Sequence, residues 1–597
     1  MAKIPSSVSI GNTTFRRPWR IPEGLKILET FVKNYPFEKN TSSEFEKDLH
    51  QKLIDEGVVD SEKKGSDWVG RKFLANCTQY GFIATRPKVI KGKYKLNNKN
   101  EDENLIEILK NIPNLNMGKK PFSLTPLGVA FKNTTSDGKE LTAEQKDIFL
   151  KSLFNHKQPS PAQEFPATYK GETFYPIKLY IDIILELKNN HMEAHITPIE
   201  MAAIINDYKT NSIKKIIKEI KDFRLAFTKH KGYERDLGKQ WYKKKERDIQ
   251  WETARDYYDI NFEAAINTGL FAKKGKKLIL KNEEVHIAKI ISKFNYKYSD
   301  EKGFEYLENL WSGGLLPFED KELLAEETLN IVNKLEKEHK IKSDLVFDKN
   351  TSDKELKKTY YLNKDKYTNL QEIKYYKDQK NKGSEIIKIL ADIQQKKNKE
   401  IYVDGEVIEA KPQHLEWIIW RVFLAINGFV NDVKKTRNFP IDDNFIASHY
   451  ASSGAEDMLF EFENYVLLVE PSFKEGRPQA KDEGEPVMFH CAKKITEFTK
   501  KPVYTLFVGP TIAPQLLNFY LQDFVIGKKQ IDKNKINIVP MTINQISNIF
   551  EKLFLEKKIL TSQYFKNILD ACLKEKKNMT AEPWGEHINK TVSNFLN

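Results

Sequence analysis

The strongest constraint on the fold is the order of segments in residues 400–597, where short apolar runs alternate with helical segments. Strand-like runs occupy 457–462, 466–470, 503–508 and 536–539, and an apolar helix is expected over 412–423. Strands that alternate with helices are typical of an α/β domain. We therefore predict that 400–597 forms such a domain around a central mixed sheet.

The remaining sequence divides into two further parts. From about residue 318 to 399 the sequence is charged and contains scarcely any Gly or Pro, and we predict a helical linker domain with bounds of 294–399. Residues 1–293 carry two successive patterns of helices followed by a hairpin, in subdomains of about 1–150 and 151–293. This order is typical of winged helices. We predict an α+β region of two winged-helix subdomains, and hence a multidomain protein.

The first winged-helix pattern joins a helix over 68–80 to a hairpin with basic residues, which are Arg86, Lys88, Lys91, Lys93 and Lys95. In the second, Thr197-Pro198 is a helix-start signal for residues 199–205, and a further helix is expected over 212–227. A turn at Gly275-Lys276 then leads into a strand over 277–280. Both hairpins are predicted wings.

Net charge favours a polyanionic partner. The chain carries 97 Lys and Arg against 84 Asp and Glu, a formal charge of +13. Such an excess suits nucleic acid, although an AT-rich genome that inflates lysine content explains it equally well. The stretch 229–247 is basic, with Tyr233, Trp241 and Tyr242 interleaved. It is interpreted either as a phosphate-binding segment, whose rings contact sugars or fill a local core, or as a solvated helix face.

Cysteine usage and hydropathy restrict the environment. Cys77, Cys491 and Cys572 are far apart, which excludes a disulfide framework and a CxxC zinc site. We expect core thiols in a reducing compartment. No apolar stretch has the length of a membrane span, and the first residues lack the apolar segment of a signal peptide. A cytoplasmic protein without a membrane partner is the expectation.

The candidate chemistry lies in the hairpin of 457–470. Two strands with a turn at Glu463-Asn464 would bring Asp457 and Glu470 to the same end. Hydrolysis of a phosphodiester needs a divalent cation, and Mg²⁺ prefers hard oxygen ligands such as carboxylates. The spacing is similar to the PD-(D/E)xK nuclease pattern. That pattern usually has Lys two residues after the second acid; Ser472 stands there, and Lys474 is the nearest lysine.

Three more residues are candidates for the same site. Glu416 lies in the otherwise apolar helix 412–423, where it is either a structural carboxylate or, with the hairpin, an active-site acid. Glu483 belongs to an acidic stretch that is either a solvated turn or a contributor to a second metal or the attacking water. His490 follows on a predicted helix and could move a proton or hold a phosphate.

The chain resembles the AlwI-like family of type IIS restriction endonucleases, which includes strand-specific nicking enzymes. The resemblance extends over most of the length and rests on these segments: Gly11-Asn12-Thr13-Thr14-Phe15-Arg16-Arg17-Pro18, Arg20-Ile21, Gly70-Arg71-Lys72, Tyr80-Gly81-Phe82, Thr268-Gly269-Leu270-Phe271, Glu416-Trp417, Glu456-Asp457, Val469-Glu470, Lys474-Glu475-Gly476 and Glu485-Pro486-Val487.

This resemblance implies a recognition region, a helical linker and a C-terminal nuclease domain that cuts outside a short asymmetric site in double-stranded DNA. By the same resemblance, Glu416, Asp457, Glu470 and Glu483 occupy the family's acid positions, and the family often lacks the motif lysine. Mg²⁺ is the expected cofactor, held by Asp457, Glu470 and Glu416. The candidate DNA-binding residues are Arg16, Arg17, Arg20, Arg71, Lys72, Lys243, Lys244 and Lys245.

Two other interpretations remain open at this stage. One is a strand-specific nicking enzyme or the large subunit of a heterodimer, because one active site cuts one strand and a second copy or a small nuclease subunit would cut the other. The second is a non-catalytic winged-helix regulator, which needs no acid cluster. Metal-dependent cleavage distinguishes the enzyme from the regulator.

Overall fold

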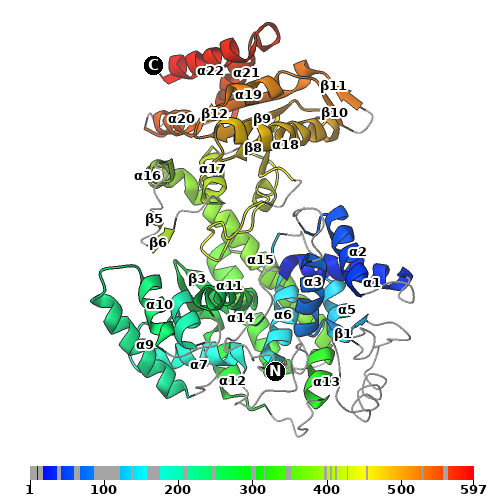
Figure 1. The fold of residues 1–597 in the computed structure, drawn as a ribbon, viewed down its shortest axis with the longest axis vertical. Helices are drawn as coiled ribbons and strands as arrows, with labels where there is room; N and C mark the ends of the chain where they lie inside the picture. The colour runs from blue at the N-terminus through cyan, green and yellow to red at the C-terminus, as the bar shows by residue number, and fades with distance from the viewer. Residues whose placement is uncertain are drawn as a thin grey trace. The chain divides into compact units, whose positions relative to one another are not determined.

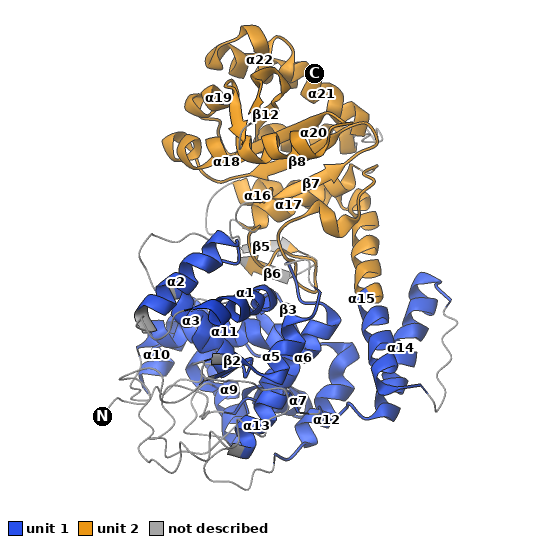
Figure 2. Ribbon diagram, turned by 90° about the vertical axis from the view of Figure 1, so that its right-hand side faces the viewer, with its two compact units in different colours: residues 1–365 blue, residues 366–597 orange. Residues whose placement is uncertain are grey.

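The computed structural model is rich in helices and contains several small sheets (Figure 1). It describes residues 10, 18–35, 42–59, 68–85, 122–135, 139–157, 175–205, 212–244, 250–296, 304–314, 316–342, 351–394, 400–403, 406–409, 413–426, 428–451, 455–526, 529–555 and 562–596. The chain forms two compact units, residues 1–365 and 366–597 (Figure 2). The boundary falls inside helix α15 (Asp353–Asp378).

Unit 1 is built mainly from helices. They are α1 (Ile21–Asn34), α2 (Ser42–Asp55), α3 (Trp68–Gln79), α5 (Pro126–Lys132), α6 (Ala143–Asn155), α7 (Pro176–Asn189), α8 (Pro198–Glu200), α9 (Ile213–Thr228), α10 (Glu234–Lys243), α11 (Trp251–Asn267), α12 (Val285–Lys293), α13 (Phe304–Ser312) and α14 (Lys321–His339). Its strands are β1 (Ile83–Thr85), β2 (Phe122–Leu124), β3 (Phe271–Lys274) and β4 (Lys277–Leu280). These elements enclose one large apolar core.

Local sequence signals explain several of these elements. The Thr197 hydroxyl accepts a hydrogen bond from the Glu200 backbone N–H at 3.1 Å, and the Glu200 carboxylate accepts one from the Thr197 N–H at 2.8 Å. This capping box starts α8 where the sequence predicts a helix. Gly275 has a φ of 58°, which lets β3 turn directly into β4. The predicted helix–hairpin succession is present here.

The first predicted wing lies largely outside the described residues. Strands β1 and β2 pair in antiparallel fashion, but 86–121 between them, with all five basic residues of that wing, belong to the part not described. The structure therefore shows an α-rich unit with short hairpins. The winged-helix assignment itself stays a prediction.

Unit 2 contains α16 (Gly383–Gln394), α17 (Gln413–Ala425), α18 (Gly476–Glu497), α19 (Pro514–Tyr520), α20 (Ile543–Leu555), α21 (Ser562–Leu573) and α22 (Ala581–Leu596). Its strands are β5 (Glu400–Val403), β6 (Glu406–Glu409), β7 (Met458–Glu461), β8 (Val466–Pro471), β9 (Val503–Gly509), β10 (Phe524–Ile526), β11 (Lys529–Ile531) and β12 (Asn537–Thr542). The small pairs β5–β6 and β10–β11 are antiparallel hairpins.

The main sheet of unit 2 confirms the predicted mixed sheet. Its order is β12-β9-β8-β7, with β7 antiparallel to β8 and the other neighbours parallel. Every residue of β8 and β9 is buried, as expected for central strands covered on both faces. Helices α17, α18, α20 and α21 contact this sheet. The covered sheet supplies a rigid base for the residues at the ends of β7 and β8.

Two further expectations concern the cysteines and the hydropathy of the helices. All three cysteines are buried and free, which confirms that they are core thiols. Among the helices that the structure describes, none combines the length and the apolar character that crossing a bilayer requires.

Candidate active site

The β7–β8 hairpin brings Asp457 and Glu470 together. Leu459 pairs with Leu468 and Met458 with Val469, so the same register continued by one residue sets Asp457 opposite Glu470. Directly opposite residues of an antiparallel pair share a face of the sheet. The Asp457 backbone N–H also faces the Glu470 Oε2 at 3.4 Å. The two carboxylates therefore lie at one end of the hairpin, on one face.

That face is the one covered by α18. Leu468 and Leu459 pack there with Ile495 of α18, and Glu470 follows Leu468 at the alternating spacing of a strand. The helix delivers His490, whose Nδ1 lies 2.8 Å from the Glu470 Oε1. Both side chains of this pair are buried. One face of the hairpin and one face of α18 thus enclose the site.

Helix α17 supplies the third acid. Residues 413–424 of α17 are all buried, including Glu416. The Glu416 Oε2 accepts a hydrogen bond from the Ala451 backbone N–H at 3.0 Å. Its negative charge is one of the causes that raise the pKa of Asp457. A carboxylate in an apolar helix is therefore directed toward the hairpin rather than toward solvent.

Electrostatics show that the acids gather around Asp457. Burial raises the pKa of Asp457 well above its usual 3.8, and the charges of Glu416, Glu470, Glu483 and Glu456 raise it further. Like charges in one buried site disfavour ionisation of each other. The four candidate acids of the sequence analysis are thus neighbours in space.

Burial and pairing have opposite effects on the pKa values of Glu470 and His490. Burial raises the pKa of Glu470, and the hydrogen bond from His490 opposes that shift without cancelling it. Burial lowers the pKa of His490, but the hydrogen bond and charge of Glu470 outweigh it, so the net shift is upward. Each partner favours the charged form of the other. The ring of His490 is held with Nδ1 toward Glu470.

Glu483 is linked to the residues that stand where the nuclease pattern has its lysine. The Ser472 hydroxyl donates to the Glu483 Oε1 at 2.9 Å, and the Lys474 Nζ lies 3.1 Å from the same oxygen. Lys474 also pairs with Asp482 at 3.3 Å. Glu483 is therefore part of a polar network, and Lys474 approaches the acid cluster through it.

Sequence reasoning gave no role to Glu456, Lys494 or Tyr520. Glu456 is buried, and its Oε1 lies 3.1 Å from the Nζ of Lys494, one turn after His490 on α18. The hydroxyl of Tyr520 at the end of α19 is buried without a hydrogen-bond partner among the described residues, and burial with the charges of Glu483 and Glu470 raises its pKa. The spacing of four between His490 and Lys494 was the one signal available.

A preformed metal site is not evident in the described part of the chain. No group of three or more His, Cys, Asp and Glu side chains meets there in an arrangement that could hold a metal ion. Mg²⁺ is usually held by only one or two carboxylates and keeps several waters. Two neighbouring carboxylates such as Asp457 and Glu470 satisfy that smaller requirement.

The candidate DNA-binding residues are placed in different ways. Arg71 is exposed on α3, whereas Lys72 beside it is buried. Arg20 is buried too, and its Nη1 donates to the Val58 carbonyl at 3.0 Å. Lys243 and Lys244 are exposed at the end of α10. Arg16, Arg17 and Lys245 lie outside the described residues.

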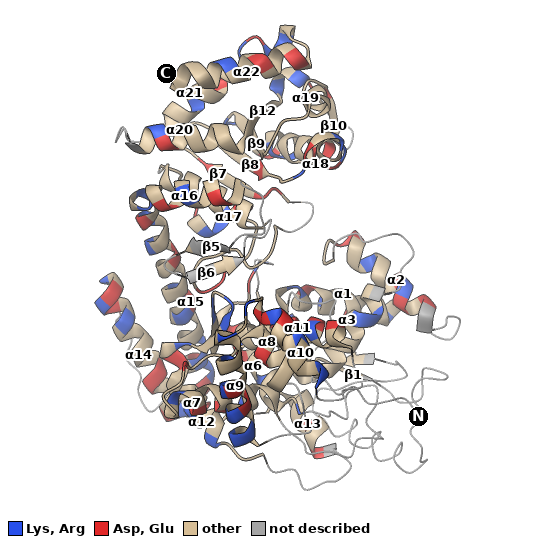
Figure 3. Ribbon diagram, turned by 60° about the vertical axis from the view of Figure 1, so that its left-hand side comes forward, with Lys and Arg blue, Asp and Glu red and all other residues tan. Residues whose placement is uncertain are grey.

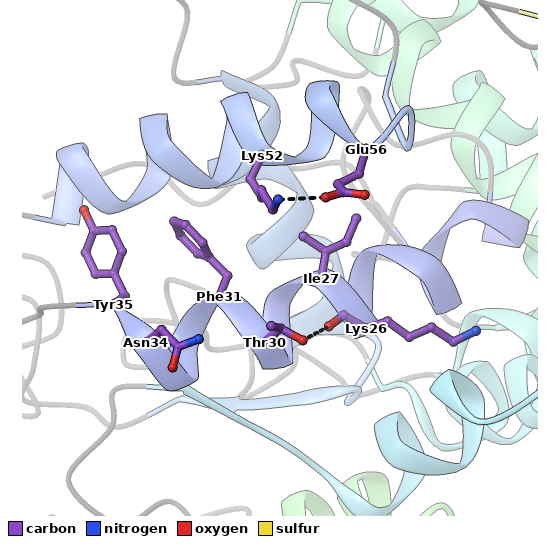
Figure 4. A pocket seen from close by; sticks show the side chains of 8 residues that line it. All are labelled: Lys26, Ile27, Thr30, Phe31, Asn34, Tyr35, Lys52 and Glu56. Carbon is purple, nitrogen blue, oxygen red and sulfur yellow. Dashed lines mark hydrogen bonds and ion pairs between the residues drawn. The ribbon is translucent and has the colours of Figure 1, made fainter.

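One pocket lies in unit 1, between α1 and α2 (Figure 4). It has a volume of about 530 Å³ and is lined by Lys26, Ile27, Thr30, Phe31, Asn34, Tyr35, Lys52 and Glu56. Its one acid, Glu56, is paired with Lys52 at 2.7 Å. None of the candidate site residues lines it, so it contributes nothing to the proposed chemistry.

The carboxylate cluster predicts an unusual pH dependence of stability. In EDTA, we expect the Asp457→Asn variant to be more stable than the wild type, by an amount that grows with pH. Folding raises the pKa of Asp457, so the protonated carboxyl stabilises the folded wild type. This contribution to the free energy of unfolding is fully present below pH 3.8, the usual pKa, and is lost as the pH rises through the raised pKa of the folded state. Urea unfolding of both proteins between about pH 5 and pH 8 measures the difference.

Asp482→Asn is the matched control, because this acid lies on α18, next to Glu483, but is exposed and paired with Lys474. Its stability relative to the wild type should change little across the same pH range. If the Asp457→Asn difference is constant with pH, the carboxyl does not titrate in the raised range, and the electrostatic account of the cluster is wrong.

The AlwI restriction endonuclease family profile matches residues 110–584, which include parts of both units. No curated protein sequence matches the chain. Among solved structures, the small subunit (R.BspD6I2) of the heterodimeric restriction endonuclease R.BspD6I is similar, with 21% identity, a TM-score of 0.29, and coverage of 35% of this chain and 98% of that chain. A second is the BpuJ1 endonuclease binding domain in complex with modified DNA, at 10% identity, a TM-score of 0.27, and coverage of 49% and 91%.

Proposed function

Because the chain belongs to the AlwI restriction endonuclease family, we propose that it is a type IIS enzyme, which binds a short asymmetric site in double-stranded DNA and hydrolyses a phosphodiester outside that site with Mg²⁺. The observation that carries this proposal is the gathering of acids from α17, the β7–β8 hairpin and α18 around Asp457. A PD-(D/E)xK-type nuclease domain is the matching fold proposal for 400–597.

The donor set fits a hard divalent cation. Asp457 and Glu470 would hold it, with Glu416 beside them, because carboxylate oxygens are the ligands that Mg²⁺ prefers. When bound, the cation supplies positive charge to the scissile phosphate and lowers the pKa of the attacking water. Without a cation, burial and then the repulsion from the neighbouring acids both disfavour the charged form of Asp457 and raise its pKa.

The protein's own residues take separate tasks in this proposal. His490 holds Glu470 through Nδ1 at 2.8 Å, which leaves Nε2 to exchange a proton with water or with the leaving oxygen. Lys474, bound to Glu483, provides positive charge near the place of the missing motif lysine. Lys494 offsets the charge of Glu456. These pairs keep the acid cluster oriented.

Each part of the chain is given the role that the family resemblance implies for it. We assign DNA recognition to 1–293, the connection to the helical segment 294–399, and cutting to 400–597. The described part of the chain contains one such acid cluster, so one copy would cut one strand. A second copy or a small nuclease subunit would then cut the other, and without it the enzyme would nick. The non-catalytic regulator gives no account of the buried acids.

Removal of the metal provides the direct test. With supercoiled plasmid and Mg²⁺, we expect nicked or linear product, and in EDTA we expect cleavage to fall by about a thousandfold or more, since the cation stabilises the transition state by several kcal/mol. Gel electrophoresis over a time course measures the rate. Sequencing of the product ends gives the recognition site and the cut offset.

Excess Mg²⁺ added to the EDTA sample is the control, and it should restore the full rate. DNA binding, measured by fluorescence anisotropy, should persist in EDTA, because the recognition region contains none of the proposed metal ligands. Cleavage that continues unchanged in EDTA would contradict the proposal, and binding without any cleavage in Mg²⁺ would favour the regulator.

A further inference from the structure

Helices α9 and α10 carry an unusual share of the positive charge. Residues 213–244 contain eleven Lys and Arg against four Asp and Glu, whereas the whole chain carries 97 against 84. Figure 3 marks Lys and Arg in blue on the ribbon of α9. More than half of the chain's net charge of +13 therefore comes from these two helices and the turn between them.

The charge on α9 is arranged along one face. Lys214, Lys218 and Lys221 are exposed and follow each other at helical spacings of four and three, and exposed Leu225 continues the row. The buried positions of α9, which are Ile216, Ile217, Ile220 and Phe223, lie on the other side of the helix. We call Lys214, Lys218 and Lys221 the α9 lysine row.

Nearby acids do not neutralise this row. Glu219 accepts a hydrogen bond from Trp241 at 2.8 Å, and Glu234 accepts one from the Thr197 hydroxyl at 2.6 Å. Within the described residues, no ion pair joins the three lysines to a carboxylate, although Asp222 is exposed on α9. The positive charge of the row is therefore presented to solvent.

Aromatic side chains in the same segment separate into two kinds. Trp241 packs edge-on against Phe223 and Tyr242 packs against Trp251, each with ring centroids 5.4 Å apart. Tyr233, in the turn between α9 and α10, is instead 82% exposed. The interpretation of this segment as a local aromatic core thus holds for the first two rings. Tyr233 is left to contact a partner.

We propose that the α9 lysine row, together with Tyr233 in the turn that follows α9, is a docking surface for the phosphate backbone of duplex DNA, an inference that rests on the proposed function. The row extends over about 10 Å of helix, a length along which a duplex presents about six phosphate charges. Lysines are point charges that bind phosphates without reading bases. The surface therefore contributes equally to the DNA-binding affinity whatever the base sequence of the DNA.

Salt dependence tests this surface directly. In the triple variant Lys214→Gln, Lys218→Gln and Lys221→Gln of the full chain, the slope of log affinity against log salt should fall in magnitude by about 2 to 3, since each phosphate contact contributes about 0.9. Fluorescence anisotropy with a labelled duplex of arbitrary sequence, titrated in EDTA at several NaCl concentrations, measures it. Tyr233→Ala removes a hydroxyl that can donate a hydrogen bond to a phosphate oxygen, and it should weaken binding about fivefold or more without changing the slope.

A second triple variant controls for net charge. Lys337→Gln, Lys354→Gln and Lys358→Gln remove the same charge from exposed positions of α14 and α15 in the same unit, where acids are interleaved. Its slope should equal that of the wild type. An unchanged slope for the α9 variant, or an equal decrease for both triples, overturns the inference. If the wild type cleaves no plasmid with Mg²⁺, it is the proposed function that fails.

Discussion

Plasmid cleavage by the Asp457→Asn variant should fall by about a thousandfold to ten-thousandfold, which corresponds to roughly 4 to 5.5 kcal/mol of transition-state stabilisation. Asparagine keeps the shape of the side chain but loses the negative charge that would attract a cation. Asp457 is the residue on which Glu416, Glu470, Glu483 and Glu456 all act electrostatically. Asp457 is therefore the acid on which the burial and the charges of the cluster converge.

DNA binding and stability separate a catalytic loss from misfolding. The variant should bind duplex DNA as the wild type does and should unfold in EDTA at a higher urea concentration, because one repulsive charge is gone. Asp482→Asn, which removes an exposed acid of α18, should keep its cleavage rate within about threefold, as is usual for surface substitutions. A rate within tenfold of the wild type for Asp457→Asn would exclude this residue as a metal ligand.

The β7–β8 hairpin is predictable from the sequence because its signals are local. Two short apolar runs, a tight turn between them and an acid at each end specify two paired strands, and the register follows from the turn. The same is true of the Thr197 capping box, where residues three apart make both hydrogen bonds. Patterns within a few residues are sufficient in both places.

The ion pairs that hold the site in place leave no comparable local pattern in the sequence. Glu456 meets Lys494 across the sheet–helix interface, and Arg437 meets Glu372, which lies 65 residues earlier. Pairs between distant segments leave no periodicity in the sequence. For the same reason, charge alone could not reveal that Arg20 is buried against the Val58 carbonyl. Which basic side chains face solvent depends on tertiary packing.

Arg437 illustrates how a structural residue can control the candidate site. It is fully buried, its Nε donates to the Glu372 Oε1 at 2.9 Å, and its Nη1 donates to the Phe439 carbonyl at 2.7 Å. Its backbone forms a β-bridge with Met458, and the next residue, Asn438, donates from its backbone N–H to the Asp457 carbonyl at 2.9 Å. The arginine is thus attached both to α15 and to the strand that presents Asp457.

The Arg437→Met variant should therefore lose about 3 to 5 kcal/mol of the free energy of unfolding of unit 2, because it leaves the Glu372 carboxylate buried without its partner. That loss is a large part of the 5 to 15 kcal/mol typical of a domain.

The double variant Arg437→Met with Glu372→Leu should recover most of it, since two apolar side chains replace the whole pair. Urea unfolding followed by circular dichroism measures both values. The Lys566–Asp570 pair on α21, in which the aspartate is exposed and the lysine only partly buried, is the control, and Lys566→Met should cost about 1 kcal/mol. If Arg437→Met costs no more than this surface substitution, the buried pair does not hold the hairpin, and the position of Asp457 must depend on the sheet alone.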